Sequence, residues 1–152
     1  MYVETAAQTR FSDFSLNGCL HFSKCLMYFE KARFAVAKDA GLREVMSIAY
    51  PGKNVQFWVA KTDIKYFAPV PVSYDGSNEL AVRSWIKEPF ISGLTFEQEL
   101  TDIRTETPFI RAKIEIAMVI LNEGLIRIMH ESVRQCLEDY LNKTLRNGPR
   151  SL

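Results

Sequence analysis

One stretch, residues 10–42, constrains the fold more than any other part of the chain. A polar loop rich in Ser, Asp and Asn covers residues 12–18, and a long helix is predicted to begin near residues 20–22. Gly41 is a typical helix terminator, and Lys38 in the last turns suits the negative end of the helix dipole. The rest of the chain must be arranged around this long helix.

The predicted helix has one narrow charged stripe and is apolar around most of its remaining circumference. Lys24, Lys31 and Lys38 recur at every seventh residue, so they fall on one line that must face solvent. The other positions are expected to be buried: Phe22, Cys25, Leu26, Met27, Phe29, Phe34, Val36, Ala37 and Ala40. A helix of this kind is predicted to be wrapped on most sides, as it would be under a curved sheet.

Arg33 breaks this apolar pattern. It lies about 180° from Lys24 when each residue turns the helix by about 100°, which places it in the middle of the face expected to be buried. An unpaired buried charge is very costly, so Arg33 needs a partner. One alternative is a structural ion pair with Asp13, Glu30 or a carboxylate across an interface. The other is a ligand that the guanidinium binds or polarises.

The rest of the chain predicts an antiparallel sheet and a second helix. Strands are expected at 2–11, 55–67, 78–88, 94–104 and 109–121, and turns between them, including one over residues 42–54. Helical spacing returns over residues 129–145, with Val133, Leu137, Tyr140 and Leu141 on one face. This order predicts an α+β fold with a single hot-dog domain over residues 1–146, in which an antiparallel sheet wraps a long central helix. A short C-terminal helix and a flexible tail at 147–152 complete it.

The composition excludes several classes of function. The chain of 152 residues has a formal net charge of +1 and no basic cluster, so a nucleic-acid partner is not expected. The most apolar run, residues 114–121, is too short to span a bilayer, and no signal peptide is expected. Three cysteines without metal or redox spacing predict a reducing, cytoplasmic location. His21 and His130 lie far apart in sequence, so neither a metal site nor a cofactor is predicted.

The segments, taken in order, resemble hot-dog thioesterases of the 4-hydroxybenzoyl-CoA thioesterase type. RFSDFSLNG is similar to the family's strand and loop, and MYFEKARFAVAKDAGL is similar to its helix signature. The segments TDIKYFAPV, YDGSNELAVRSWI and ISGLTFEQEL resemble its next strands, and RIMHESVRQCL resembles its last helix. The resemblance implies an enzyme that hydrolyses an acyl-CoA or acyl-carrier-protein thioester. It also implies a homodimer or homotetramer whose sheets join edge to edge, with acyl sites between protomers.

The catalytic carboxylate of that family has no counterpart here. The family carries an Asp fifteen residues before the Glu of the helix signature, and counting back from Glu30 leads to Ser15. A serine hydroxyl does not replace that carboxylate without an activating base beside it. The sequence is similar in this respect to the hot-dog thioesterases of enediyne polyketide pathways, which use an asparagine and a helix arginine. Arg33 matches that arginine, whereas Asn17 lies two residues after the place of the asparagine.

Several residues are candidates for the remaining chemistry. Asn17 can orient water, and His21 either accepts a proton or only caps the helix. The dipeptide His21-Phe22 also resembles the His-Phe of naphthoyl-CoA thioesterases, which keep their Asp. Asp13 either acts beside Ser15 or pairs with the helix arginine, and Cys19 is either a nucleophile or a packed thiol.

The substrate is expected to lie over the start of the helix. Backbone N–H groups at residues 18–22 are predicted to bind the thioester carbonyl oxygen, and Gly18 allows a close approach. By resemblance, Cys19, Phe22 and Phe29 contact the acyl group, and Glu30 belongs to the scaffold. Two functions remain open: a thioesterase of fatty-acyl or polyketide chains that works without the usual Asp, and a protein that binds, cyclises or dehydrates such chains.

Overall fold

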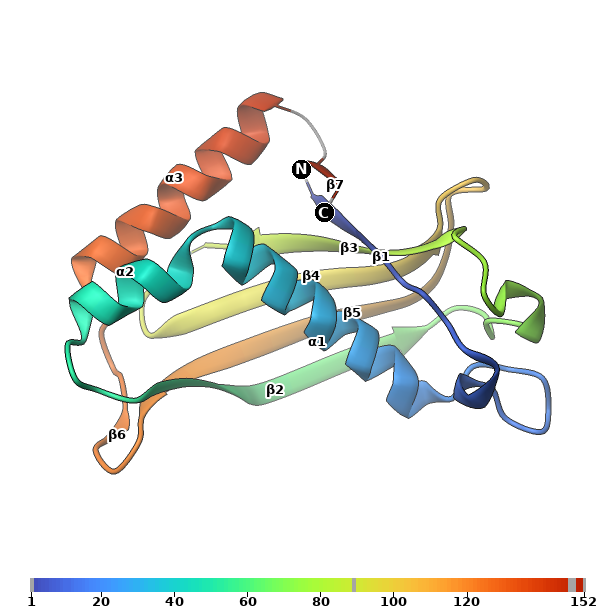
Figure 1. Ribbon diagram of the computed structural model, residues 1–152, viewed down its shortest axis with the longest axis horizontal. Coiled ribbons are helices and arrows are strands. Elements are labelled where there is room, and N and C mark those ends of the chain that lie inside the picture. Colours follow the sequence, from blue (N-terminus) through green and yellow to red (C-terminus); the bar gives the residue numbers. More distant parts are fainter. Residues whose placement is uncertain (1, 89, 148–149, 152) are drawn as a thin grey trace.

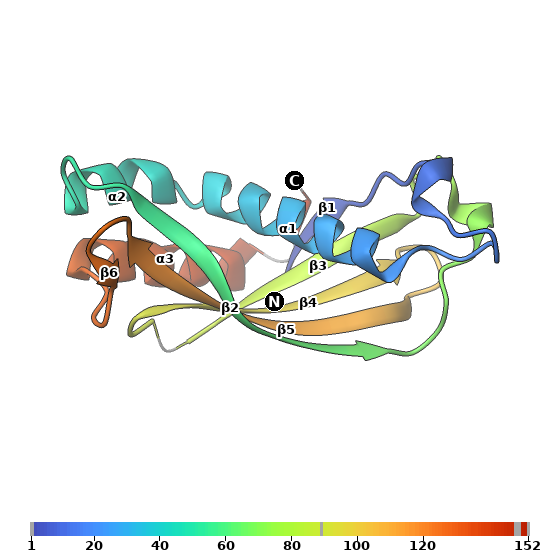
Figure 2. The ribbon, with the colours of Figure 1, turned by 90° about the horizontal axis from the view of Figure 1, so that it is seen from below.

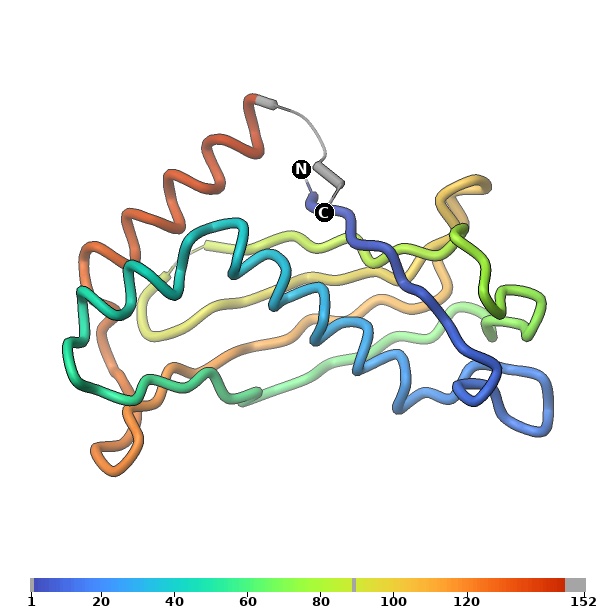
Figure 3. Tube along the Cα trace, viewed as in Figure 1, coloured from blue at the N-terminus to red at the C-terminus, as the bar shows by residue number. Residues whose placement is uncertain are grey.

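A curved antiparallel sheet with one long helix across its face forms the body of the protein (Figure 1, Figure 2). The computed structural model describes residues 2–88, 90–147 and 150–151 (Figure 3). The sheet has the order β2-β5-β4-β3-β1-β7, and β6 pairs with the end of β5. The strands are β1 (Val3–Ala6), β2 (Val55–Tyr66), β3 (Leu80–Lys87), β4 (Gly93–Asp102), β5 (Thr107–Ile120), β6 (Gly124–Leu125) and β7 (Arg150–Ser151). All neighbours are antiparallel except β1 and β7.

Alternation along the strands creates the core, because one face of the sheet packs under α1 (Phe22–Asp39). Val82 pairs with Leu100, and Phe96 pairs with Ile114, and all four side chains are almost fully buried. The opposite face carries ion pairs such as Lys87–Glu97 and Arg111–Glu99. The predicted strands of the sheet's centre are therefore confirmed, with their apolar side toward the helix.

The long helix ends where the sequence predicts. Gly41 adopts φ +69°, a left-handed conformation that glycine reaches without strain. The chain then forms a second helix, α2 (Leu42–Ala49), in the region predicted to be a turn. That prediction was wrong because Pro51 and Gly52 dominated the interpretation, although Leu42, Val45, Met46 and Ala49 already have helical spacing.

The burial of α1 differs from the prediction. Phe29, Ala32 and Val36 are fully buried, as one face of the helix packs on the sheet. However, Phe22 and Phe34 are each 66% exposed, and Leu26 and Met27 are exposed as well. The expectation that these four residues are buried in the chain is wrong, because the sheet covers one side of the helix only. An apolar side of α1 remains open.

The C-terminal helix, α3 (Glu131–Asn147), packs against α2 beyond the end of α1 (Figure 1). Val133, Leu137 and Tyr140 are buried, which confirms the predicted face. In the segment predicted to be a tail, β7 pairs in parallel with β1, while residues 148, 149 and 152 lie outside the described residues. Two short 3-10 turns, Phe11–Asp13 and Val72–Tyr74, shape the connections near the start of α1.

Candidate functional site

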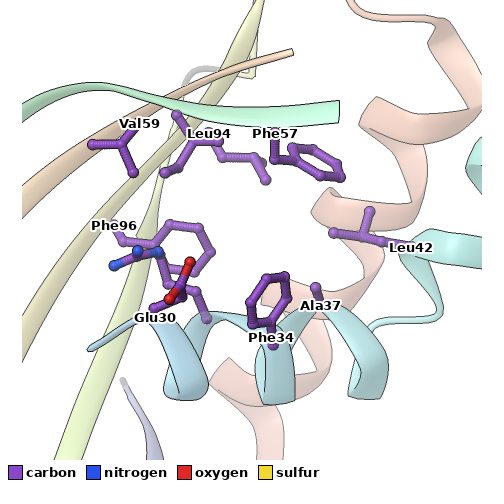
Figure 4. A pocket seen from close by; sticks show the side chains of 10 residues that line it. Glu30, Phe34, Ala37, Leu42, Phe57, Val59, Leu94 and Phe96 are labelled. Atoms are coloured by element: carbon purple, nitrogen blue, oxygen red, sulfur yellow. The ribbon is translucent and has the colours of Figure 1, made fainter. Parts of the chain in front are cut away.

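A narrow cleft of about 70 Å³ lies between the middle of α1 and the sheet, close to the edge formed by β2 (Figure 4). We call it the Arg33 cleft. It is lined by Glu30, Arg33, Phe34, Ala37, Leu42, Phe57, Val59, Leu94, Phe96 and Ile116. Every lining residue except the glutamate and the arginine is apolar. The cleft therefore offers one cation and one carboxylate within apolar walls.

Arg33 is held in this cleft by a neutral group. Its Nη1 donates a hydrogen bond of 2.8 Å to Oε1 of Gln98. Burial lowers the pKa of Arg33, and the charge of Glu30 raises it, but among the described residues no carboxylate lies within ion-pair distance of the guanidinium. The ion pairs predicted with Asp13 and Glu30 are therefore not formed. Four of the five N–H donors of an arginine side chain remain without a described protein acceptor.

Gln98 is the residue of this site that sequence reasoning missed. It lies on β4, is fully buried, and its Nε2 donates to the carbonyl oxygen of Phe29 at 3.0 Å and to Oγ of Ser84 at 2.9 Å. Its signal was available in the sequence, because it follows Leu94 and Phe96 at the inward positions of an alternating strand. A polar residue at such a position must find hydrogen-bond partners in the core.

Asp13 pairs with groups at the loop itself rather than with Arg33 of the same chain, and its predicted role beside Ser15 stays a prediction. Its carboxylate accepts hydrogen bonds from the hydroxyl of Tyr28 and from the backbone N–H of Arg10, and Lys24 lies 3.6 Å away. Burial alone would raise the pKa of Asp13, but these donors and the lysine charge lower it below its usual value. The same burial and the bond to Asp13 raise the pKa of Tyr28. Asp13 thus fixes the turn before α1, and its predicted pairing with Arg33 is wrong.

The loop before α1 is held by its own backbone. The N–H of Ser15 donates to the carbonyl of Cys19 at 2.8 Å, and the N–H of Gly18 donates to that of Ser15 at 2.9 Å. Gly18 adopts φ +75°, which requires glycine. Ser15 is half-buried and Asn17 is exposed. We call residues 10–22 the loop end of the molecule.

Backbone donors at the loop end are fewer than predicted. Of residues 18–22, the N–H groups of Gly18, Leu20 and His21 already donate to carbonyls of the protein. In the described chain only Cys19 and Phe22 of this group keep N–H donors without a protein acceptor. His21 precedes the first helical residue, is exposed, and makes no side-chain cap. The neighbouring thiol of Cys25 is buried, which raises its pKa to about 12 and makes it inert.

Phe22 and Phe29, both predicted to contact the acyl group, lie in different surroundings. Phe22 lines a second apolar cleft at the end of β2, together with Tyr66 and Phe67. Phe29 is fully buried in the core and lines neither cleft.

Within one chain, the predicted site residues form two groups rather than one. Helical rise of about 1.5 Å per residue places Arg33 about 18 Å along α1 from His21. Ser15, Asn17 and Gly18 belong to the loop end, and Arg33 belongs to the cleft further along the helix.

Among the described residues, no helix is both long and apolar enough to cross a membrane. No three His, Cys, Asp or Glu side chains in that part of the chain gather closely enough to hold a metal ion.

Several solved structures with the same arrangement are thioesterases or probable thioesterases. YbaW, a probable thioesterase from Escherichia coli, superposes with a TM-score of 0.73 at 16% identity, covering 91% of this chain and 98% of that one. A 1,4-dihydroxy-2-naphthoyl-CoA thioesterase from Synechocystis gives 0.71 at 15% identity, over 93% and 96% of the two chains. The dynemicin thioesterase, crystallised in a study of polyene binding, gives 0.71 at 12% identity, over 92% and 97%. The chain has the hot-dog fold.

The hot-dog assignment rests on structure, because no family model and no curated protein matches the sequence. At 12–16% identity these three likenesses establish the fold alone. Within this hot-dog fold, α1 is the central helix (Figure 1), the loop end precedes it, and the Arg33 cleft lies beside its middle. The resemblance to the 4-hydroxybenzoyl-CoA thioesterase type stays a prediction.

Proposed function

We propose that this protein is a thioesterase that hydrolyses an acyl-CoA or acyl-carrier-protein thioester. The observation that carries the proposal is Arg33: a half-buried guanidinium, held by one neutral hydrogen bond, in a cleft whose other lining residues are apolar except for Glu30. Apolar surroundings strengthen the interaction of such a cation with an oxygen that develops negative charge. Structural similarity to known and probable thioesterases supports the same reaction class.

The reaction needs little more than a polarised carbonyl and a positioned water. The water oxygen attacks the carbonyl carbon, and the N–H donors of Arg33 stabilise the resulting oxyanion. The C–S bond then breaks, giving a carboxylic acid and a thiol. Since Ser15 replaces the usual carboxylate, His21 is our candidate for accepting the proton of the water, and Asn17 for orienting it.

A homodimer would bring the two groups together. β2 is an edge strand of 12 residues, and Phe57, Trp58 and Val59 on it are 40–54% exposed. Such a long apolar edge favours pairing with another strand, and two-fold symmetry makes a second β2 its natural partner. The exposed side chains of Phe22 and Phe34 on α1 lie beside the same edge in the two clefts.

Symmetry then places each cleft near the partner's loop end. The Arg33 cleft is lined by Phe57 and Val59, which lie in the first half of β2. The cleft that contains Phe22 is lined by Tyr66, which is the last residue of β2. Antiparallel pairing of two β2 strands sets the first half of one beside the second half of the other. Arg33 of one protomer and the loop end of its partner would thus share one acyl site.

The dimer is tested by measuring the mass in solution. Sedimentation equilibrium should give twice the chain mass of 17.5 kDa, or four times if dimers associate further. Trp58→Lys, which adds charge to the exposed edge, should shift the mass toward the monomer. The matched control is Leu145→Lys, since Leu145 is 60% exposed near the end of α3. A monomeric wild-type protein would reject the shared site.

The finer function that we propose is release of a fatty-acyl or polyketide product in the cytoplasm. The resemblance to thioesterases that lack the Asp supports the substrate class, and three free cysteines agree with a reducing compartment. A second function, acyl binding, cyclisation or dehydration without hydrolysis, is favoured by one observation: Ser15 offers no carboxylate to activate water.

Thiol release from a panel of thioesters separates the two functions. The panel combines CoA and carrier-protein thioesters with acyl groups from short aryl to long polyene chains. We expect turnover on one class above that of the Arg33→Met variant. Absence of turnover on the whole panel, with acyl ligands still bound, would reject the thioesterase and favour the non-hydrolytic function.

A further inference from the structure

Gln98 is fully buried on β4, and both the oxygen and the nitrogen of its side-chain amide make hydrogen bonds. Its Nε2 donates to Phe29 O and Ser84 Oγ, and its Oε1 accepts from Arg33. Phe29 and Arg33 lie one helical turn apart on α1. Gln98 therefore ties β4 to the helical turn that carries the guanidinium.

Only one orientation of the Gln98 amide satisfies all three contacts. Turning the amide over would point its NH₂ group at the donors of Arg33 and its oxygen at the carbonyl of Phe29. Both new contacts would be repulsive in a buried setting, where unpaired polar groups are costly. The carbonyl of Phe29, which can only accept, thus fixes the direction of Oε1, and Oε1 fixes the guanidinium.

The neutrality of this acceptor has a chemical consequence. A carboxylate at the same place would form an ion pair and cancel much of the arginine's charge toward any other group. An amide oxygen holds one edge of the guanidinium and leaves its charge and its remaining donors available.

We propose that Gln98 is a positioning residue, which holds the Arg33 guanidinium by a neutral hydrogen bond so that it can polarise a thioester carbonyl. The inference rests on the proposed thioesterase function. It adds a residue of the sheet to a site that was predicted from the helix and loop alone.

Gln98→Met tests the position with a side chain of similar length and no hydrogen-bonding groups. We expect kcat to fall between about 10-fold and 100-fold, as for the loss of a hydrogen bond to a charged group, with KM little changed. The matched control is Thr101→Val on the same strand, because Thr101 is also fully buried and donates to the carbonyl of Thr107 at 2.9 Å. The control should lower Tm without a selective fall in kcat.

A second variant separates position from charge. Gln98→Glu keeps an acceptor beside Arg33 but replaces the neutral bond with an ion pair. It also loses the donor to Phe29 O, so its Tm is measured beside its turnover. We expect the arginine to stay immobilised while kcat falls. If this variant is as active as the wild type, a neutral acceptor is not required and the proposal is wrong.

Dependence on Arg33 distinguishes a positioning role from a structural one. In the Arg33→Met background, Gln98→Met should cost no further turnover, because the group that it positions has gone. A residue needed only for folding would lower turnover by the same factor in both backgrounds. That result would overturn the proposal.

A measurement without turnover keeps the two proposals separate. The ¹⁵N NMR signals of the Arg33 guanidinium, identified by their loss in Arg33→Met, should show slow rotation in the wild type and fast rotation in Gln98→Met. Such a change in a protein without thioesterase activity would reject the function and uphold the positioning. Unchanged signals and unchanged turnover in Gln98→Met would reject the positioning.

Discussion

The loop end and the Arg33 cleft differ in how the chain surrounds their charged groups. At the loop end, Asp13 accepts hydrogen bonds from Tyr28 and a backbone N–H, and Lys24 balances its charge. In the Arg33 cleft, the guanidinium has one neutral hydrogen-bond partner, no carboxylate within ion-pair distance among the described residues, and walls that are apolar except for Glu30. The charge of Asp13 is therefore balanced by groups of its own chain, whereas the charge of Arg33 has no ion-pair partner in the described part of the chain.

This difference shows which of the two charges is available to a ligand. A matched carboxylate stabilises the fold, and approaching molecules gain little from it. A half-buried cation with unused donors gains most when a carbonyl or an anion enters beside it. From the sequence, Asp13 and Arg33 each had a structural and a functional alternative. The contacts now distinguish them, because Asp13 anchors the loop and Arg33 keeps donors for a ligand.

Removing the available charge should have the largest effect. Arg33→Met is expected to lower kcat/KM by about 100-fold, because the variant loses charged hydrogen bonds to the oxyanion in an apolar site. Its Tm should fall only slightly, since one neutral hydrogen bond is lost. Thiol release and thermal unfolding measure the two effects.

The matched control for this change is Lys31→Met on the same helix. Lys31 is exposed and lies over the ring of Tyr28, away from the cleft. Turnover should stay close to the wild type. An equal loss of turnover in both variants, or no loss in Arg33→Met, would contradict the proposed difference between the loop end and the Arg33 cleft.

Removing the matched charge should act on stability instead. Asp13→Asn is expected to lower the free energy of unfolding by about 1–3 kcal/mol, because buried donors lose their charged acceptor. Turnover per folded molecule should change little. Urea unfolding measures the first quantity, and the exposed Asp75→Asn serves as the control.

The pH dependence of stability follows from the same carboxylate. The pKa of Asp13 is lowered in the fold from the ordinary value of 3.8. Its contribution to stability is therefore present above pH 3.8 and is lost as the pH falls through the lower folded value. Asp13→Asn should remove this part of the acid sensitivity. An unchanged acid profile would show that the fold does not favour the ionised form of Asp13.

The fold was largely predictable from periodicity, and its failures have physical causes. Alternation located β3 to β5, and Gly41 located the end of α1, because these signals act locally. Periodicity also showed that Phe22 and Phe34 are apolar positions of a helix. It does not show whether the covering surface comes from the same chain, and here they are exposed.

The site was predictable only as far as the helix extends. The helical wheel placed Arg33 on the covered face of α1, where it lines the cleft. Its partner Gln98 lies 65 residues away in sequence, so the contact depends on how β4 packs beneath α1. The pairing of Asp13 with Arg33 was not formed in the chain because a 3-10 turn, rather than an extended segment, carries the Asp13 carboxylate to Tyr28.

The smallest effect that we predict comes from the loop end. Ser15→Asp restores a carboxylate where the resemblance expects one, at a half-buried side chain without a hydrogen bond in the described chain. If Arg33 supplies the main catalytic contribution, turnover should change by less than about 10-fold, or about 1.4 kcal/mol in the barrier. Ser12→Asp, three residues earlier in the loop, adds the same charge at an exposed position and serves as the control. Hydrolysis that appears only in Ser15→Asp would show that the natural protein binds acyl thioesters without cleaving them, and that the free charge of Arg33 serves recognition rather than catalysis.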